Sequence, residues 1–195
     1  MTSRRESFAE RRERRAAVDD PAVVLEAAAR FLEARSRSVA EVRRRLTGAG
    51  YRADLVGGAI ERLMELGMLD DEAFARAWVE SRDRARPRGE RAIREELRLK
   101  GVERPSIDLV LGERRDAVAS DDTGAHAEDD GAMPSADRLA AERLLTRHRR
   151  ALERVADPRQ RRHRAYALLA RNGFDPETCR EVAATVTSTE PVDDL

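Results

Sequence analysis

The stretch Val42-Arg-Arg-Arg-Leu46-Thr-Gly-Ala-Gly50-Tyr51 decides the fold, because the same phrase recurs twice further along the chain. It returns as Ile93-Arg-Glu-Glu-Leu97-Arg-Leu-Lys-Gly101-Val102 and as Ala165-Tyr-Ala-Leu-Leu169-Ala-Arg-Asn-Gly173-Phe174. In each copy, apolar residues stand eight and four positions before the glycine, and another apolar residue follows it. This spacing places two side chains on one helical face and predicts a left-handed stop at the helix end. A fixed internal repeat predicts an assembly of small helical units that offers a binding surface rather than a reaction site.

The composition favours an all-α protein. Of the 195 residues, 41% are hydrophobic, 39% are charged and only 4% are aromatic, and the mean hydropathy is -0.68. Such a chain buries Leu, Val, Ile and Ala in narrow seams beneath a charged exterior. Alternating apolar runs that would indicate strands are absent. No run approaches the length of a membrane span, and the N-terminus lacks the apolar core of a secretory signal. The single cysteine, Cys179, excludes an internal disulfide and agrees with a reducing cytoplasm.

The formal net charge of zero conceals a division along the chain. Residues 1–15 carry six Arg and three Glu, residues 112–137 carry two Arg and eight acids, and residues 188–195 carry three acids. The net charges of these three segments are +3, -6 and -3, which sum to -6. Because the whole chain has a net charge of zero, the remaining residues carry a net charge of +6. The part expected to fold is therefore basic, which suits a polyanion or an acidic groove on a protein.

The helix signals divide the chain into three similar parts. Pro21, Pro158 and Pro176 each stand at a predicted helix start, and Ser38 with Glu41 forms a capping box. We expect three tandem three-helix repeats in an elongated, curved array, over residues 21–67, 68–113 and 137–187. The other segments have too little apolar surface to pack. They are assigned to a flexible charged N-terminal arm (1–20), a disordered acidic insert (114–136) and an acidic C-terminal tail (188–195).

The residues give no support to enzyme chemistry. His126, His148 and His163 are scattered without the paired spacing of metal ligands. Cys179 falls on an inward helical face with no histidine motif nearby, which predicts a buried thiol rather than a nucleophile. We therefore expect a protein with no catalytic residues, no metal and no cofactor.

The candidate contact residues are arginines on or near the middle helix of each repeat. With the apolar positions turned inward, these arginines point outward, and two more stand in the loop before Gly89. A solvated face is the simpler interpretation of any one of them. Their recurrence at related positions favours a shared role, because guanidinium groups pair bidentately with carboxylates and phosphates. The predicted partner- or DNA-contacting residues are Arg43, Arg44, Arg86, Arg88, Arg94, Arg98, Arg161, Arg162, Arg164 and Arg171.

Several stretches between Phe31 and Leu111 resemble the RecX family, regulators of the RecA recombinase. They are Ser36-Arg-Ser-Val-Ala-Glu-Val-Arg-Arg-Arg-Leu46, Ala59-Ile-Glu-Arg-Leu-Met-Glu-Leu-Gly-Met-Leu-Asp-Asp71, and Arg88-Gly89 leading to Ile93-Arg-Glu-Glu-Leu97 and Lys100-Gly101. In the last repeat, Ala170-Arg171-Asn172-Gly173-Phe174 resembles the family's basic-Gly-Phe phrase. The resemblance covers nearly all of residues 22–187 except the acidic insert.

The resemblance implies an elongated, all-helical protein of three repeats that binds the RecA–DNA filament. Such a protein would inhibit the recombinase, ATPase and coprotease activities of RecA, and so modulate homologous recombination and the SOS response. We expect a cytoplasmic monomer that also contacts single-stranded or double-stranded DNA non-specifically and does not bind membranes. Two alternatives stay open: a helix-turn-helix-type DNA-binding protein, and a helical scaffold for another acidic partner. The outward Arg and Glu residues, with few Asn or Gln to read adenine, disfavour the first.

Overall fold

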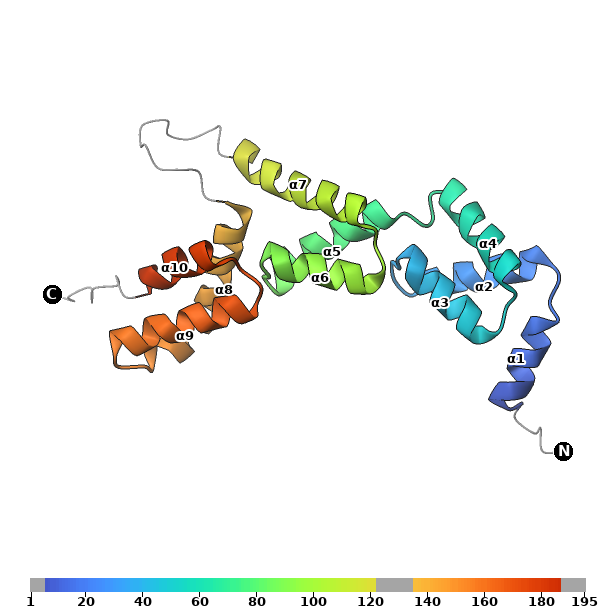
Figure 1. Ribbon diagram of the computed structural model, residues 1–195, viewed down its shortest axis with the longest axis horizontal. Coiled ribbons are helices and arrows are strands. Elements are labelled where there is room, and N and C mark those ends of the chain that lie inside the picture. Colours follow the sequence, from blue (N-terminus) through green and yellow to red (C-terminus); the bar gives the residue numbers. More distant parts are fainter. Residues whose placement is uncertain (1–5, 122–134, 187–195) are drawn as a thin grey trace. The chain divides into compact units, whose positions relative to one another are not determined.

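The computed structural model describes residues 6–121 and 135–186, and all the regular structure in these ranges is helical (Figure 1). The all-α prediction is therefore confirmed. The helices are α1 (Phe8–Ala16), α2 (Pro21–Glu33), α3 (Val39–Ala49), α4 (Ala53–Glu65), α5 (Asp71–Ala85), α6 (Glu90–Lys100), α7 (Arg104–Asp121), α8 (Ala136–Glu153), α9 (Pro158–Arg171) and α10 (Pro176–Thr185).

The helices group into three trios, α2–α4, α5–α7 and α8–α10, which we call repeats 1, 2 and 3. Two segments differ from the sequence analysis. Part of the predicted flexible arm forms α1, which begins with a capping box of Ser7 and Glu10. Helix α7 continues to Asp121, so the start of the predicted disordered insert is helical. The rest of that insert, 122–134, and the predicted acidic tail lie outside the described residues.

Contacts between backbone segments define two compact units. Unit 1 comprises Met1–Ala75 and Arg98–Ser106, and unit 2 comprises Arg76–Leu97 and Ile107–Leu195. The division runs through the helices of repeat 2, so each unit contains the place where one repeat meets the next. We call these places the first and second junctions.

Each unit has its own apolar core. In unit 1, α2 packs on α3 and α4; this core buries Val24, Ala28, Val42, Leu46, Val56, Ala59, Ile60, Leu63 and Leu69. In unit 2, α8, α9 and α10 pack together; this core buries Ala140, Ala141, Leu144, Leu145, Leu152, Ala165, Leu169, Phe174, Cys179, Val182 and Ala183. The apolar positions of the recurring phrase are therefore inward, as the spacing predicts.

The three glycines of the recurring phrase adopt the predicted left-handed conformation. Their φ angles are 106° at Gly50, 82° at Gly101 and 83° at Gly173, where a side chain would be strained. Each glycine also lies against an earlier helix that is outside its own repeat. A Cβ atom would overlap Arg12 of α1 at Gly50, Ala40 of α3 at Gly101, and Ala92 of α6 at Gly173. The phrase thus ends a helix and provides room for a neighbour at the same residue.

At both junctions the backbone is capped across the repeats. The carbonyl of the residue before the glycine accepts a hydrogen bond from the start of the middle helix of the preceding repeat. At the first junction the Ser38 hydroxyl donates to the Lys100 carbonyl (2.6 Å), and at the second the Gly89 N–H donates to the Asn172 carbonyl (3.0 Å). In return, an aspartate of the following repeat accepts an N–H at that helix start. These bonds join Val39 to Asp71 (2.8 Å) and Glu90 to Asp137 (3.0 Å). Free helix-start donors are thereby satisfied.

A buried ionic cluster explains why residue 114 is ordered. The side chain of Arg114 is only 6% exposed, although the sequence analysis assigned it to the disordered insert. It donates two hydrogen bonds to Asp83, both 2.9 Å, and one of 2.6 Å to Asp137. Burial alone would lower the pKa of Arg114, but the two carboxylates outweigh it and raise that pKa. Residue 114 therefore belongs to the second junction.

Candidate partner-binding surfaces

The predicted outward face of α3 borders a hollow in unit 1. Arg43 and Arg44 are exposed, while Val42 and Leu46 on either side of them in the sequence are buried. Neither guanidinium makes a hydrogen bond or ion pair within the described part of the chain. Both line a hollow of about 700 Å³, which we call the α3 hollow. Its wall also carries the acidic side chains of Asp70, Asp71, Glu72 and Glu103.

Large apolar side chains are exposed beside the α3 hollow. Met64, which lines it, is 51% exposed, and Leu66 and Met68 in the link to α5 are 50% and 52% exposed. Methionine adapts its shape to a partner, and protein interfaces combine apolar contacts with arginine at their core. Mixed charge with exposed apolar groups is typical of a surface that binds protein rather than a surface that binds phosphates alone.

The predicted arginines of the 86–89 loop and α6 have different environments. Arg86 and Arg98 are exposed. Arg88 donates to the Asn172 side-chain oxygen at 3.0 Å and lies 3.6 Å from Glu96. Arg94 bonds to Asp108 and to Glu90, and the hydrogen bond with Asp108 raises its pKa. Arg88 and Arg94 thus already have carboxylate partners within unit 2.

Glu96 of α6 joins this helix to α5. Its carboxylate accepts hydrogen bonds from the Trp78 indole (2.8 Å) and from Arg82 (2.6 Å). The Arg82 guanidinium also lies over the Trp78 ring, 4.3 Å from its centroid. This is a cation–π contact inside the protein, so Trp78 packs within unit 2.

The third group of predicted arginines lies on α9 in unit 2. Arg161 donates to the Val155 carbonyl at 3.1 Å and is partly buried. Arg162, Arg164 and Arg171 are exposed, and none of their side chains has a hydrogen bond or ion pair among the described residues. These three are therefore available to an external anion.

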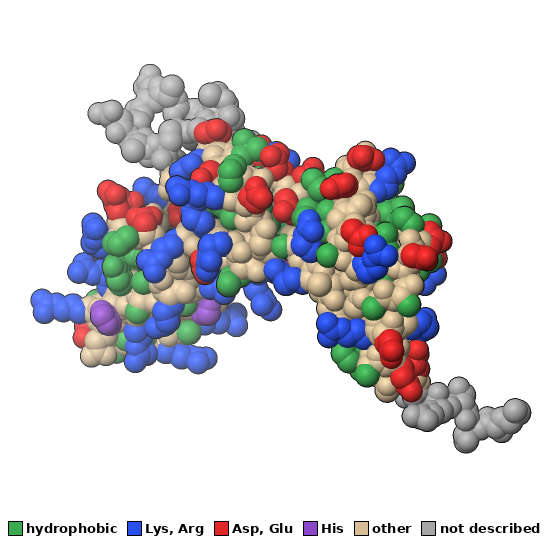
Figure 2. Space-filling model, turned by 45° about the vertical axis from the view of Figure 1, so that its right-hand side comes forward, with side chains coloured by type: hydrophobic (Ala, Val, Ile, Leu, Met, Phe, Trp, Pro, Cys, Tyr) green, Lys and Arg blue, Asp and Glu red, His purple; other side chains and the backbone are tan. Residues whose placement is uncertain are grey.

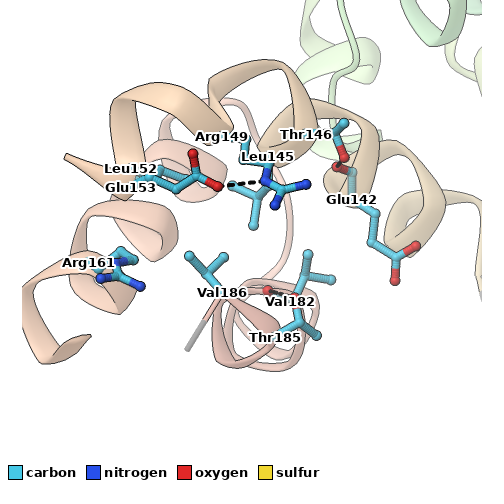
Figure 3. Close-up of a pocket in the computed structure, with 10 residues that line it drawn as sticks. All are labelled: Glu142, Leu145, Thr146, Arg149, Leu152, Glu153, Arg161, Val182, Thr185 and Val186. Atoms are coloured by element: carbon cyan, nitrogen blue, oxygen red, sulfur yellow. Dashed lines mark hydrogen bonds and ion pairs between the residues drawn. The ribbon is translucent and has the colours of Figure 1, made fainter. Parts of the chain in front are cut away.

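Arg161 also borders a cavity of about 530 Å³ between α8 and α10 (Figure 3). Leu145, Val182 and Val186 point toward its centre, and Arg149 on its rim pairs with Glu153 at 2.6 Å. The charge of that arginine is therefore balanced within the cavity. Leu145, Leu152 and Val182 of its lining belong to the buried core of repeat 3.

Sequence reasoning missed a second hollow on α9. Residues 143–164 contain nine Arg and only two acids, and Figure 2 shows basic side chains, all of them Arg, gathered over the α8–α10 part of unit 2. A hollow of about 670 Å³ lies there, which we call the α9 hollow. It is lined by Pro158, Arg159, Arg162, His163, Tyr166, Arg180 and Ala183, with no carboxylate. Counting charge over single helices would have found it.

The structure also bears on metal, membrane and thiol chemistry. Within the described ranges, no three His, Cys, Asp or Glu side chains are grouped to hold a metal ion. No described helix is both long and apolar enough to span a bilayer. The predicted buried thiol is confirmed: Cys179 is enclosed in the repeat 3 core, and burial raises its pKa. A raised pKa keeps the thiol protonated and unreactive.

Comparison with known proteins gives the same family from sequence and fold. Residues 25–63 match the family model for the first three-helix domain of RecX, and residues 70–111 match that for the second. The regulatory protein RecX of Mycolicibacterium vanbaalenii is 33% identical over 167 residues, covering 83% of this chain and 80% of the relative. That of Mycobacterium sp. strain JLS is 36% identical over 153 residues, covering 78% of this chain and 75% of the relative.

Solved structures agree on the fold. A RecX crystal structure from Lactobacillus salivarius superimposes with a TM-score of 0.67 at 17% identity, covering 86% of this chain and 97% of the other. A second crystal structure, of a regulatory protein RecX, gives a TM-score of 0.66 at 18% identity and covers 94% and 81%. Tandem three-helix repeats are common to these structures and confirm the predicted fold class. On the extent and identity of these matches, the chain belongs to the RecX family of regulatory proteins.

Proposed function

We propose that this protein binds the RecA–DNA filament and inhibits its recombinase, ATPase and coprotease activities, and so modulates homologous recombination and the SOS response. In this proposal it acts in the cytoplasm as a monomer, without catalysis or a cofactor. Membership of a family of RecX regulatory proteins supports a RecA partner.

The observation that carries the proposal is the α3 hollow. Arg43 and Arg44 have no partner among the described residues, and they line the same hollow as the half-exposed Met64. Two unpaired guanidinium groups next to an adaptable apolar side chain match an acidic and apolar patch on another protein. The acidic residues in the same wall would oppose a bare phosphate backbone, which favours RecA itself over DNA as the partner of this surface.

In this proposal, inhibition results from binding along a filament that repeats the same RecA subunit. Several modest contacts joined by one chain give strong avidity on a polymer, because the second contact forms at high effective concentration. A bound chain would block the path of incoming duplex or hinder movement between the nucleotide states of RecA. The second mechanism requires a higher affinity for one filament state than for the other.

The test uses RecA on single-stranded DNA with a non-hydrolysable ATP analogue. The double variant Arg43→Glu/Arg44→Glu should bind the filament at least about tenfold more weakly, since two charge-assisted contacts become repulsive, and should lose inhibition of ATP hydrolysis. The matched control is Arg30→Glu/Arg62→Glu, which changes the charge equally in unit 1 at exposed pairs with Glu26 and Glu65. Full inhibition by the Arg43/Arg44 variant, with helicity unchanged, would rule out this surface.

A further inference from the structure

We infer that the α9 hollow is a binding site for single-stranded nucleic acid, with phosphates on its arginines and a base against Tyr166. The inference deepens the proposed function and rests on it for its setting, because the filament holds both RecA and a DNA strand. It assigns the strand to repeat 3, on a surface separate in character from the α3 hollow.

Helical spacing brings the side chains of the hollow together. Arg159, Arg162, His163 and Tyr166 stand at i, i+3, i+4 and i+7 on α9, and therefore lie on one face over a rise of about 10 Å. Arg180 of α10 completes the hollow from the neighbouring helix. The set thus forms a short basic strip on two packed helices, which fixes its geometry.

The arginines of this strip have no counter-ion in the part of the chain that the structure describes. The side chains of Arg159, Arg162, His163 and Arg180 are exposed, and none has a hydrogen bond or ion pair among the described residues. On α9 the nearest acid in sequence, Asp157, caps the helix and accepts the N–H of Arg159 at 2.9 Å. On α10, Glu177 and Glu181 stand three residues and one residue from Arg180, but neither forms an ion pair with it within the described ranges. Like charges held together without a counter-ion repel one another, so an arriving polyanion gains attraction and also relieves that repulsion.

Tyr166 favours a single strand over other polyanions. Its ring is partly buried and packs against the repeat 3 core, so it is held as a fixed wall of the hollow. Single-strand binding sites combine a basic groove with aromatic rings on which bases stack. The bases of a duplex are already stacked on one another and cannot stack on such a ring. Binding of an acidic protein would depend on the arginines and not on an aromatic ring. The hollow also lacks the carboxylates that characterise the α3 hollow.

The experiment measures binding of the full chain to a dye-labelled oligo-dT by fluorescence anisotropy between 50 and 200 mM NaCl. The variant Arg159→Gln/Arg162→Gln/Arg180→Gln should bind more than about tenfold more weakly at 50 mM. Its plot of log affinity against log salt should flatten by about 2, the value for three lost phosphate contacts on a single strand. The matched control, Arg143→Gln/Arg150→Gln/Arg154→Gln, removes the same charge from two exposed positions of α8 and from its C-cap residue, and should lose much less.

The ring is tested separately. Tyr166→Leu should weaken oligo-dT binding about tenfold with little change in the salt slope, because stacking is lost while the charges remain. Tyr166→Phe keeps the ring and should bind like the parent protein. Circular dichroism of each variant checks that repeat 3 stays folded, and the phenylalanine variant keeps the test valid if the leucine variant is unfolded.

Three results would overturn the inference: equal losses in the α8 control, tighter binding to duplex than to oligo-dT, or loss of RecA binding alone in the triple α9 variant. Loss of RecA binding alone would indicate that the basic strip on α9 and α10 binds an acidic protein surface instead of a nucleic acid strand. Failure of the proposed function is distinguishable. A parent protein that binds oligo-dT through this hollow but does not inhibit RecA leaves the inference intact and removes the proposal.

Discussion

The two junctions share backbone contacts but differ in the side chains that secure them. At the first junction, Asp71 accepts the Val39 N–H and forms no ion pair with any described residue, and the adjacent ion pair joins Lys100 to Glu41 at 3.0 Å. At the second, Arg114 is buried between Asp83 and Asp137. A buried ion pair is costly to desolvate and strongly destabilising to break. The second junction therefore adds a buried ionic cluster to the shared backbone contacts, whereas the first adds only a partly exposed ion pair.

This difference follows the course of the chain. Repeats 1 and 2 are joined by a short link, whereas residues 122–134 separate α7 from α8. Arg114 and Asp137 stand on either side of that longer segment and pair across it. Closing a longer loop costs more chain entropy, so a strong pair at its ends stabilises the contact between repeats 2 and 3 where chain connectivity contributes least.

The largest effect is expected from filling the closest backbone contact. Gly89→Ala should destabilise unit 2 by at least about 3 kcal/mol, because the new Cβ would overlap the Gly173 carbonyl and the Phe174 nitrogen, and backbone atoms cannot move aside cheaply. Urea unfolding followed by Trp78 fluorescence reports on this unit. Gly48→Ala in α3 is the control: its Cβ meets nothing within 4 Å, and it should stabilise unit 1 by about 0.5–1 kcal/mol. Parent-like unfolding of the Gly89 variant would contradict the described junction.

The next effect separates the two ionic anchors. Arg114→Met should cost about 3 kcal/mol, since it leaves two carboxylates without their buried partner. Lys100→Met at the first junction should cost less than about 1 kcal/mol, because its pair with Glu41 is partly exposed. Chemical denaturation of both variants at pH 7, followed by circular dichroism, measures the contrast. Similar losses in the two would show that the junctions are anchored alike.

The smallest effect is a dependence on pH. Burial raises the pKa of Asp71, so the folded state takes up a proton at a higher pH than the unfolded state. The free energy of unfolding of the parent, measured relative to Asp71→Asn, should therefore rise as pH falls through the raised pKa, and level off below the ordinary aspartate value.

Glu41 supplies a comparison of opposite sign within the same junction. Burial alone would raise its pKa, but hydrogen bonds from Lys100 and Arg35 outweigh this and lower it. Relative to Glu41→Gln, the stability of the parent should be lost as pH falls below the ordinary glutamate value and through the lowered pKa. Denaturant titrations at several pH values test both variants, and parallel trends would contradict the assigned environments.

The sequence predicted the helices and their glycine stops because these depend on local spacing. Ile93 and Leu97 are buried, and Gly101 and Gly173 adopt positive φ, as the phrase predicts. It could not predict the environment of Arg114, whose partners are 31 and 23 residues away and whose sequence neighbourhood is acidic. Arg94 was predicted to face outward, but Asp108 of α7 lies against it. Ion pairs between helices depend on packing, which local composition does not record.

The candidate surfaces, too, could be predicted only where they depend on spacing within one helix. The outward position of Arg43 and Arg44 follows from their place between buried residues of α3. Of the residues that line the α9 hollow, only Arg162 was among the predicted contact residues, because the arginines of repeat 3 were selected around the glycine phrase. The i, i+3, i+4, i+7 pattern of the hollow was visible in the sequence. The contribution of Arg180 was not, because it depends on the contact of α10 with α9.

Helix α1 has a practical consequence for work with this protein. It packs on α3, with Arg12 against Gly50 and the Arg15 guanidinium 3.5 Å from the Ala49 carbonyl. The first glycine turn thus meets α1 where the later two meet the helix of a preceding repeat. Repeat proteins need such end caps to stay soluble. A truncated version beginning at Pro21 would expose that turn and is expected to self-associate, so binding studies need the amino-terminal segment intact.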